Sequence, residues 1–235
     1  MLGLLCRKLI PALLLLGSAG ALHAQSDYLN LANHDDQPYY FGITLGYNQS
    51  YYKLEHADKF IHDDSVLLVE PLHSQGFNLG LLGNMRINKK LDLRFNPNLV
   101  FADKGLHYLF KTDSLVEDKN IPSILLSFPL QLKLKSDRIG NFRFYVIGGL
   151  KFDYDLAANT QARREYDIVK ANKLDYGYEA GLGFEFYFPH FIFSPEIKLS
   201  NGFSNIQIRE PENPYSNIIE RLISRIIVFS IHLEG

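Results

Sequence analysis

The sequence predicts an all-β protein: a transmembrane, antiparallel up-and-down β-barrel of about eight strands, with short periplasmic turns and long extracellular loops. Three observations predict this fold class. Eight segments of about ten residues alternate apolar and polar side chains with a period of two, which is the period of a β-strand. The polar positions of these segments carry charges of both signs. The links between the segments are alternately short and long, as they are in outer-membrane barrels.

The alternation is clearest in the segment 123–136, with the sequence SILLSFPLQLKLKS. An apolar residue stands at every even position from 124 to 134, whereas Gln131 and Lys133 stand between them. A tilted strand needs about 9–11 residues to cross a bilayer, and this segment is long enough. The same pattern predicts eight strands in the segments 40–48, 76–86, 91–101, 123–136, 141–156, 175–188, 191–200 and 224–235.

Three of the predicted strands contain a proline, which cannot donate a backbone hydrogen bond to a neighbouring strand. We therefore expect bulges or local breaks at Pro97, Pro129 and Pro195.

Glycines also fall on the polar face, at Gly149, Gly181 and Gly183. We expect them to make room for the inward side chains of Tyr145 or Tyr187; a small cavity is the alternative.

The links between the predicted strands differ strongly in length. The short ones cover about 88–90, 136–141 and 189–190, and the long ones about 49–74, 104–120, 157–173 and 201–222. Short turns are periplasmic in outer-membrane barrels. Both ends of the barrel sequence should therefore lie on the periplasmic side.

Alternation alone does not say which face meets lipid, because a soluble barrel or a secreted β-sandwich also alternates, with its apolar face inward. An unpaired charge on the lipid-facing side near the bilayer midplane costs about 2–4 kcal/mol. Since the polar face carries both signs, we expect it to line the lumen, where opposite charges can pair. We expect Glu179 and Glu185 to face Arg143 and Lys151 of the preceding strand, in segment 141–156. The lumen charges expected to be structurally important are Arg94, Lys133, Arg143, Lys151, Glu179, Glu185, Glu196 and Lys198.

The domain organisation follows from the N-terminus. Residues 1–24 have the pattern of a signal peptide, with Arg7 and Lys8 before a short apolar run and Ala24 at the cleavage position. A retained anchor helix is the alternative, although the run is too short to span a membrane. Residues 25–38 then form a polar periplasmic leader, and residues 39–235 form the outer-membrane barrel domain. Cleavage would remove Cys6, the one cysteine of the chain, so no disulfide is expected.

Composition and motifs predict no catalytic, cofactor-binding or metal site. The formal net charge of −2 gives no reason to expect nucleic acid binding. The segment 55–64, EHADKFIHDD, contains the imidazole and carboxylate groups that bind divalent metals, but not at a recognised ligand spacing. A catalytic site at the barrel rim would need a histidine with a carboxylate. His107 and the histidines of segment 55–64 could meet Asp113, Asp153 or Glu179, but nothing in their spacing requires it.

Four longer segments carry a resemblance to a known family: 30–48, 76–108, 121–157 and 173–205. The most specific parts are FPLQLKLKSDR, followed by NFRFYVIGGLKFDYDLA, and FSPEIKLSNG. On these segments the chain resembles the PorT-like outer-membrane β-barrels of Bacteroidetes-type bacteria, a porin-family class linked to type IX secretion and gliding. The resemblance implies an outer-membrane protein that is needed to export cargo and has no known catalytic residues.

We therefore expect a non-enzymatic component or accessory of type IX protein secretion, placed in the outer membrane after signal-directed export. Its expected partners are outer-membrane lipid and other secretion-machinery proteins. Eight strands enclose an interior that side chains fill, so an open aqueous channel is not expected. The alternatives are a small structural or solute-transport barrel unrelated to secretion, an exported soluble β-barrel that binds an apolar ligand, and an enzyme at the rim.

Overall fold

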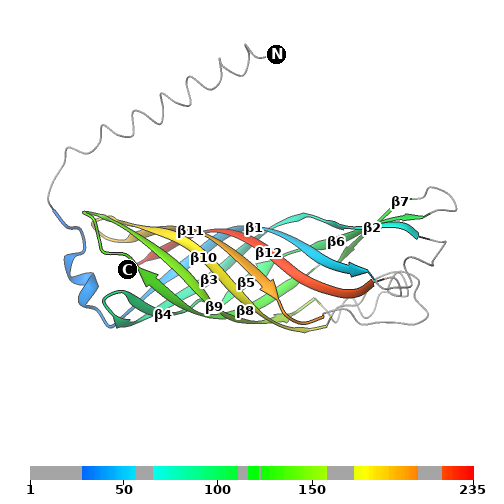
Figure 1. The fold of residues 1–235 in the computed structure, drawn as a ribbon. Helices are drawn as coiled ribbons and strands as arrows, with labels where there is room; N and C mark the ends of the chain where they lie inside the picture. The colour runs from blue at the N-terminus through cyan, green and yellow to red at the C-terminus, as the bar shows by residue number, and fades with distance from the viewer. Residues whose placement is uncertain (1–27, 57–65, 111–115, 122, 158–171, 206–218) are drawn as a thin grey trace, which may run out of the picture.

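The chain folds into a closed β-barrel with a small separate sheet beyond one end (Figure 1). The computed structural model describes residues 28–56, 66–110, 116–121, 123–157, 172–205 and 219–235. The strands of the barrel follow the order β1-β12-β11-β10-β9-β8-β4-β3, all neighbours are antiparallel, and β3 pairs again with β1, which closes the ring. The described elements are η2 Ala32–Asp36, β1 Tyr39–His56, β2 Val66–Leu72, β3 Ser74–Asn88, β4 Leu91–Phe95, β5 Asn98–Phe101, β6 Lys104–Phe110, β7 Val116–Ile121, β8 Ile124–Lys135, β9 Phe142–Asp155, β10 Leu174–Tyr187, β11 Ile192–Gly202 and β12 Ile219–Glu234. None of the described helices is long and apolar enough to cross a membrane.

Strands β4 and β5 are two parts of one barrel strand, interrupted at Asn96 and Pro97, so the ring has eight positions as predicted. Both parts pair with β3 on one side and with β8 on the other. The pairing with β8 stops at Phe95 and resumes at Asn98. The interruption therefore lies level with Pro129, whose carbonyl accepts a hydrogen bond of 3.3 Å from the Asn96 N–H. Pro129 has no backbone N–H that could donate a hydrogen bond in return. Because the neighbouring strand is interrupted at this level, it needs no donor there.

The ladder between β10 and β11 is also interrupted, at Pro195. Residue pairs are present at Gly183–Glu196 and at Phe186–Phe193, but not at the two levels between them. The gap faces the missing N–H of Pro195, which matches the expected local break.

The two ends of the barrel differ as the sequence predicts. At one end, here called the short-turn end, brief turns join β3 to β4, β8 to β9 and β10 to β11. β1 starts and β12 ends at this end, where Gly42 pairs with Glu234. The opposite end, here called the long-loop end, carries the longer connections (Figure 1).

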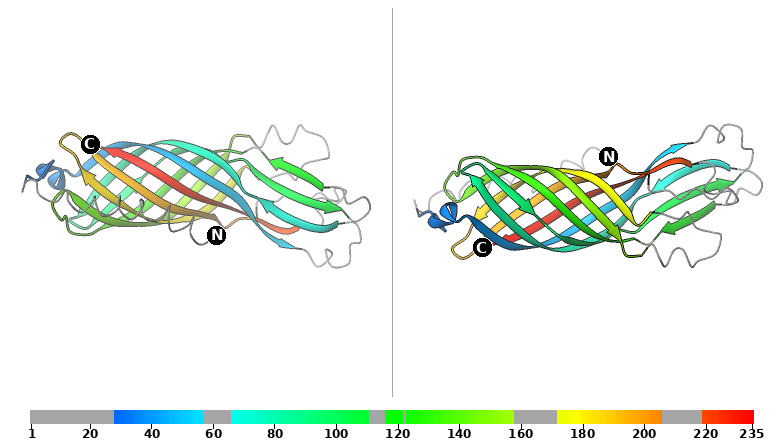
Figure 2. Two further views of the ribbon diagram at one scale, coloured as in Figure 1. Left: turned by 90° about the horizontal axis from the view of Figure 1, so that it is seen from above. Right: turned by 90° about the horizontal axis from the view of Figure 1, so that it is seen from below.

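The prediction that residues 49–74 and 104–120 are loops is wrong in part. β1 continues to His56 and pairs with β12 as far as Ile219. β2, β6 and β7 form a three-stranded sheet in the order β2-β6-β7, which projects beyond the long-loop end of the barrel (Figure 2). These strands lie outside the barrel wall, so the apolar-out, polar-in rule that reveals the other strands does not act on them.

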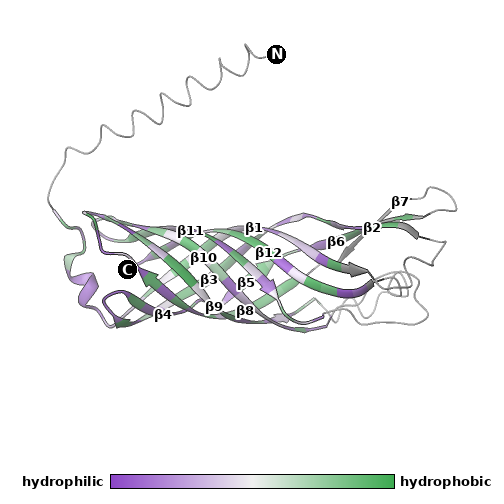
Figure 3. Ribbon diagram, viewed as in Figure 1, coloured by the Kyte–Doolittle hydropathy of each residue, from purple (hydrophilic) through white to green (hydrophobic). Residues whose placement is uncertain are grey.

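Hydrophobic and hydrophilic residues alternate along the barrel strands (Figure 3), and the apolar ones are exposed on the outside whereas the polar ones are buried inside. In β8, Leu130 and Leu132 are 51% and 47% exposed, whereas Gln131 and Lys133 between them are 1% and 0% exposed. This is the reverse of a soluble barrel, whose apolar face is turned inward. The outward face therefore needs lipid around it.

Aromatic rings gather on the outer face toward both ends of the barrel. Such groups suit the two membrane–water interfaces, where amphipathic rings are favoured. Contacts near the short-turn end join Phe142 to Phe184 (centroids 5.6 Å apart) and Phe188 to Phe191 (5.0 Å); those toward the long-loop end join Phe77 to Phe101 (4.4 Å) and Phe152 to Tyr176 (5.3 Å).

Two adjacent lysine substitutions test which face meets lipid. Leu130→Lys places a cation on the lipid-facing side and should lower the free energy of unfolding by about 2–4 kcal/mol or prevent insertion. Gln131→Lys places the same charge beside the buried Glu179, which Gln131 contacts, and should be much milder. Folding into lipid vesicles, followed by the mobility difference between boiled and unboiled samples, measures both. Equal effects of the two substitutions would contradict the assignment of the faces.

Candidate functional site: the closed lumen and its N-terminal plug

The eight lumen charges predicted from the sequence all lie inside the barrel, and each is at most 5% exposed. A buried charge must be paired, because removing one partner of a buried pair costs about 3–5 kcal/mol. Each of the eight has an oppositely charged partner within the lumen. The pairs are Arg94–Glu196, Lys133–Glu185, Arg143–Glu185, Lys151–Asp153 and Lys198–Glu179.

Arg94 is the centre of the charged layer. Its guanidinium lies 2.7 Å from Glu196 of β11 and 3.8 Å from Glu234 of β12, so it joins three strands of the ring. Tyr145 of β9 donates a hydrogen bond of 2.8 Å to the same Glu196 carboxylate, and the Arg94 guanidinium lies 5.2 Å from the centroid of the Tyr145 ring. His232 lies 3.4 Å from Glu196. This cluster fills the cross-section of the lumen.

Of the three inward glycines expected to make room for a tyrosine, only Gly183 does so, for Tyr145; a Cβ atom at Gly149 or Gly181 would instead meet the backbone of Leu130 or Ile197 on the neighbouring strand. A Cβ atom at Gly183 would lie 2.4 Å from the phenolic oxygen and from the adjacent ring carbon of Tyr145. No such contact occurs between real atoms, so a side chain at this position would displace the ring from Glu196.

A second group of charges lies toward the short-turn end. Lys133 binds Glu185 and lies 3.6 Å from Glu234, and the Tyr187 hydroxyl donates a hydrogen bond of 2.7 Å to Glu185. Lys135 lies 2.7 Å from Asp92. The cations and anions of this layer therefore neutralise each other across several strands.

On the long-loop side of Arg94, one pairing differs from the expectation. As expected, Glu185 lies near Arg143, at 3.7 Å. Glu179, however, pairs with Lys198 of β11 at 3.0 Å. Lys151 pairs with Asp153 of its own strand. The period of two places Glu179 and Lys151 on the same inner face but does not decide between partners on the two flanking strands.

Further buried charges, Lys104, Asp155 and Asp175, lie toward the long-loop end. An apolar layer beside them closes the lumen. It consists of Val100, Ala102, Leu125, Ile226 and Val228, which are all buried inside the ring. Two cavities that border this layer measure about 20 Å³ each. A single water molecule needs about 10–15 Å³ measured in this way, so each cavity holds about one water and neither is part of an open channel.

The short-turn end is closed by the chain's own N-terminal segment, residues 28–38, here called the plug (Figure 2). The carboxylate of Asp35 accepts two hydrogen bonds from the Arg143 guanidinium, of 2.9 and 2.7 Å. Arg86 donates hydrogen bonds to the carbonyl oxygens of His34 (2.7 Å) and Gln37 (2.9 Å). The predicted periplasmic leader therefore lies against the barrel at this end over its described residues.

The plug is also fixed to the turn between β8 and β9. The Asn30 side chain donates a hydrogen bond of 2.9 Å to the Tyr187 carbonyl, and the Asn30 N–H donates one of 2.9 Å to the Asn141 side chain. Arg138 donates to the Asn30 carbonyl, and its guanidinium stacks 3.7 Å from the centroid of the Tyr187 ring. The plug is thus hydrogen-bonded to three barrel strands and one turn.

Several important lumen groups were not among the predicted site residues. Glu234 contacts both Arg94 and Lys133, and it has the same parity as the inward residues of β12 from position 226 onward. That parity was the signal that could have found it. Asp35 lies in a one-turn 3₁₀-helix, which has no strand-like pattern, so no comparable signal points to it.

The candidate metal and catalytic residues do not form a site in the part of the chain that the structure describes. Asp153 and Glu179 are engaged with lumen lysines. No group of three or more His, Cys, Asp or Glu residues within the described ranges could hold a metal ion. Residues 57–65 and 111–115, which include His62 and Asp113, lie outside the described residues, as does the predicted signal peptide.

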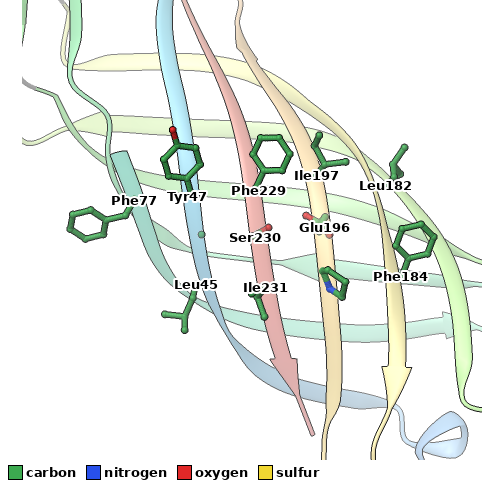
Figure 4. A pocket seen from close by; sticks show the side chains of 12 residues that line it. Leu45, Tyr47, Phe77, Leu182, Phe184, Glu196, Ile197, Phe229, Ser230 and Ile231 are labelled. Carbon is green, nitrogen blue, oxygen red and sulfur yellow. The ribbon is translucent and has the colours of Figure 1, made fainter. Parts of the chain in front are cut away.

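A shallow apolar groove of about 650 Å³ lies on the outer surface, across β1, β12, β11 and β10 (Figure 4). Its walls include Tyr47, Phe229, Ile197 and Phe184, and Pro195 forms part of its lining. Because these side chains point away from the lumen, the groove belongs to the lipid-facing surface, although Glu196, whose carboxylate binds Arg94 inside the barrel, also borders it.

The closed ring of eight antiparallel strands, apolar outside and charged inside, defines a membrane-spanning β-barrel of the outer-membrane type. The chain belongs to the family described as "Outer membrane protein beta-barrel domain", whose model matches residues 24–207. It is accordingly a protein of the outer membrane.

The chain is similar to several solved structures of outer-membrane proteins. OprG of Pseudomonas aeruginosa is 14% identical, with 82% of this chain and 94% of that chain covered and a TM-score of 0.45. Neisserial surface protein A is 12% identical, with coverages of 82% and 95% and a TM-score of 0.40. Ail of Yersinia pestis is 14% identical, with coverages of 85% and 100% and a TM-score of 0.38. No curated protein matches the sequence.

Reversing one lumen charge tests whether the ion pairs hold the barrel together. Glu185→Lys places a third cation beside Lys133 and Arg143, so the barrel should fail to assemble. The isosteric Glu185→Gln should assemble with a free energy of unfolding lowered by about 3–5 kcal/mol.

The double substitution Glu185→Lys with Lys133→Glu restores the opposite charges and should recover part of the loss. Folding into lipid vesicles shows which of the three variants assemble, and urea unfolding measures the stability of those that do. Normal assembly of Glu185→Lys would show that the pairing is dispensable.

Proposed function

We propose that this protein is a non-enzymatic, non-conducting scaffold of the outer membrane that acts as a component or accessory of type IX protein secretion. The observation that carries the proposal is the closed lumen. A barrel whose interior is filled by charges, by an apolar layer and by its own N-terminal segment offers no path for a solute. Its contribution must then come from the surfaces that it presents on the two sides of the membrane.

Both sides offer such a surface. Beyond the long-loop end, β2, β6 and β7 extend the protein away from the membrane, together with the outer parts of β1 and β12. At the short-turn end, the plug and the turn between β8 and β9 form one connected periplasmic face. We propose that other proteins of the secretion machinery bind to one of these faces.

The assignment to type IX secretion is supported by the resemblance of segments 30–48, 76–108, 121–157 and 173–205 to PorT-like barrels. The principal alternative is a passive barrel that stabilises the membrane. A solute-transport barrel is disfavoured by the closed lumen, and an exported soluble barrel is disfavoured by the apolar exterior.

Deletion of the gene tests the secretion role. The deletion strain should lose export of type IX cargo, and a plasmid copy of the wild-type gene should restore it. Quantification of cargo in the culture medium and in the periplasm measures the effect, and a periplasmic protein that does not depend on this system serves as the control. A deletion strain that exports its cargo normally would exclude the secretion role and favour a passive barrel.

Electrical recording tests the closed lumen independently of secretion. The purified protein in a planar lipid bilayer at pH 7.5 should give no stepwise conductance, because the apolar layer and the charged layer both block ions. An open porin in the same bilayer is the positive control. Regular conductance steps would contradict the non-conducting scaffold.

A further inference from the structure

We infer that the plug, residues 28–38, is released from the barrel by mild acid, with Asp35 as the latch that holds it and His34 as the group whose protonation releases it. The inference goes beyond the proposed function and is independent of which machinery the barrel serves.

Asp35 is the main polar anchor between the plug and the barrel wall. Its carboxylate forms a two-pronged contact with Arg143, and Arg86 lies 3.8 Å away on its other side. A planar guanidinium matches a carboxylate in this geometry, which makes such contacts among the strongest hydrogen-bonded pairs in proteins. The neighbouring Asp36 is exposed and offers a matched carboxylate for comparison.

His34 lies under the plug in a site built for an uncharged ring. It is 5% exposed and packs edge-on against Tyr40 (centroids 4.6 Å apart) and Tyr187 (6.1 Å). Neither ring nitrogen has a hydrogen-bond partner within the described residues. A protonated imidazole has two N–H donors, and burying them without acceptors is costly. Arg86, which holds the His34 carbonyl, adds a like charge nearby.

The surrounding carboxylates do not remove this cost. Glu185, Glu234 and Asp35 favour a charged imidazole, but Glu185 and Glu234 already pair with Lys133, and Asp35 already pairs with Arg143. The charged and titratable groups that face His34 and Asp35 are Arg86 of β3, Lys135 of β8, Arg138 of the following turn, Arg143 of β9, Glu185 and Tyr187 of β10, Glu234 of β12 and Tyr40 of β1.

The direction of the pH effect follows from the two groups of the plug. Burial lowers the pKa of His34 from its ordinary value of 6.5, and the charge of Arg86 lowers it further. Burial acts to raise the pKa of Asp35, but the hydrogen bonds and charge of Arg143 outweigh burial and hold it below its ordinary 3.8. As the pH falls below 6.5, a released His34 takes up a proton that the plugged state excludes, so acid favours release. Asp35 stays ionised throughout this range.

The size of the effect follows from the uptake of one proton. Between pH 7.5 and pH 5.5, the ratio of plugged to released molecules should fall by up to about tenfold. Release opens only the short-turn end, because the apolar layer of Val100, Ala102, Leu125, Ile226 and Val228 still closes the lumen. The released state therefore exposes Arg86 and Arg143 to the periplasm without forming a pore.

Hydrogen exchange of the full-length protein in lipid nanodiscs tests the inference, because it detects rare opening as well as frequent opening. The amides of His34 and Gln37 are hydrogen-bonded in the plug, to the carbonyls of Leu31 and His34. Their protection, corrected for the intrinsic pH dependence of exchange, should fall by up to about tenfold from pH 7.5 to pH 5.5. Amides of the barrel strands should keep their protection and serve as the internal control.

Four variants separate the roles of the two groups. His34→Phe keeps an aromatic ring between the two tyrosines but cannot be protonated, so plug protection should no longer change with pH. If phenylalanine does not fit the site, His34→Gln provides a second side chain without a titratable group in this range, with the same flat profile expected. Asp35→Asn should reduce plug protection at both pH values, whereas Asp36→Asn should not.

The following results would contradict the acid release of the plug or the roles of its two groups. An unprotected plug at pH 7.5, or wild-type protection that does not fall between pH 7.5 and pH 5.5, would show that acid does not release it. An unchanged pH response in both His34 variants would exclude His34 as the trigger. Equal effects of Asp35→Asn and Asp36→Asn would exclude Asp35 as the latch. None of these results depends on whether the barrel takes part in secretion.

Discussion

Charge neutralisation inside a ring of eight strands is the constraint on which the rest of this structure depends. The ring is too narrow to hold a column of water, so its inward side chains cannot rely on solvation. Its buried cations therefore pair with anions, which come from other strands in most pairs and from the same strand in the pair of Lys151 with Asp153. Arg94 shows the result, because its guanidinium joins β4 to β11 and β12, which lie far from β4 in the sequence. The lipid outside adds the complementary demand that the outward face carry no charge.

Other features follow from this demand for a filled and neutral interior. Gly183 lacks a side chain where the ring of Tyr145 reaches Glu196, so the hydrogen bond to that carboxylate depends on a missing Cβ on a neighbouring strand. The plug extends the same chemistry to the end of the barrel, where Asp35 adds a second carboxylate, besides Glu185 of β10, to the surroundings of Arg143. The apolar layer near the long-loop end needs no partners and completes the closure.

Most of the barrel could be predicted from the sequence, because its governing rule is local. A period of two assigns every residue of a strand to lipid or lumen, and this rule placed all eight predicted charges inside. The ion-pair partner of each inward residue could not be predicted in the same way, because the residue has a neighbouring strand on each side and periodicity does not choose between the two. Glu179, for example, pairs with Lys198 and not with Lys151. The strands β2, β6 and β7 and the plug lie outside the wall, where the rule does not apply.

The plug packs His34 between Tyr40 of β1 and Tyr187 of β10, which are separated by β3, β4, β8 and β9 in a sheet that is still open between β1 and β12. During folding, a barrel that still lacks the junction of β1 with β12 would hold these two tyrosines apart. Docking of residues 28–38 is therefore a checkpoint of completed assembly. A barrel stalled before closure would leave this segment accessible to periplasmic proteases, so quality control could recognise unfinished molecules by their undocked N-terminal segment.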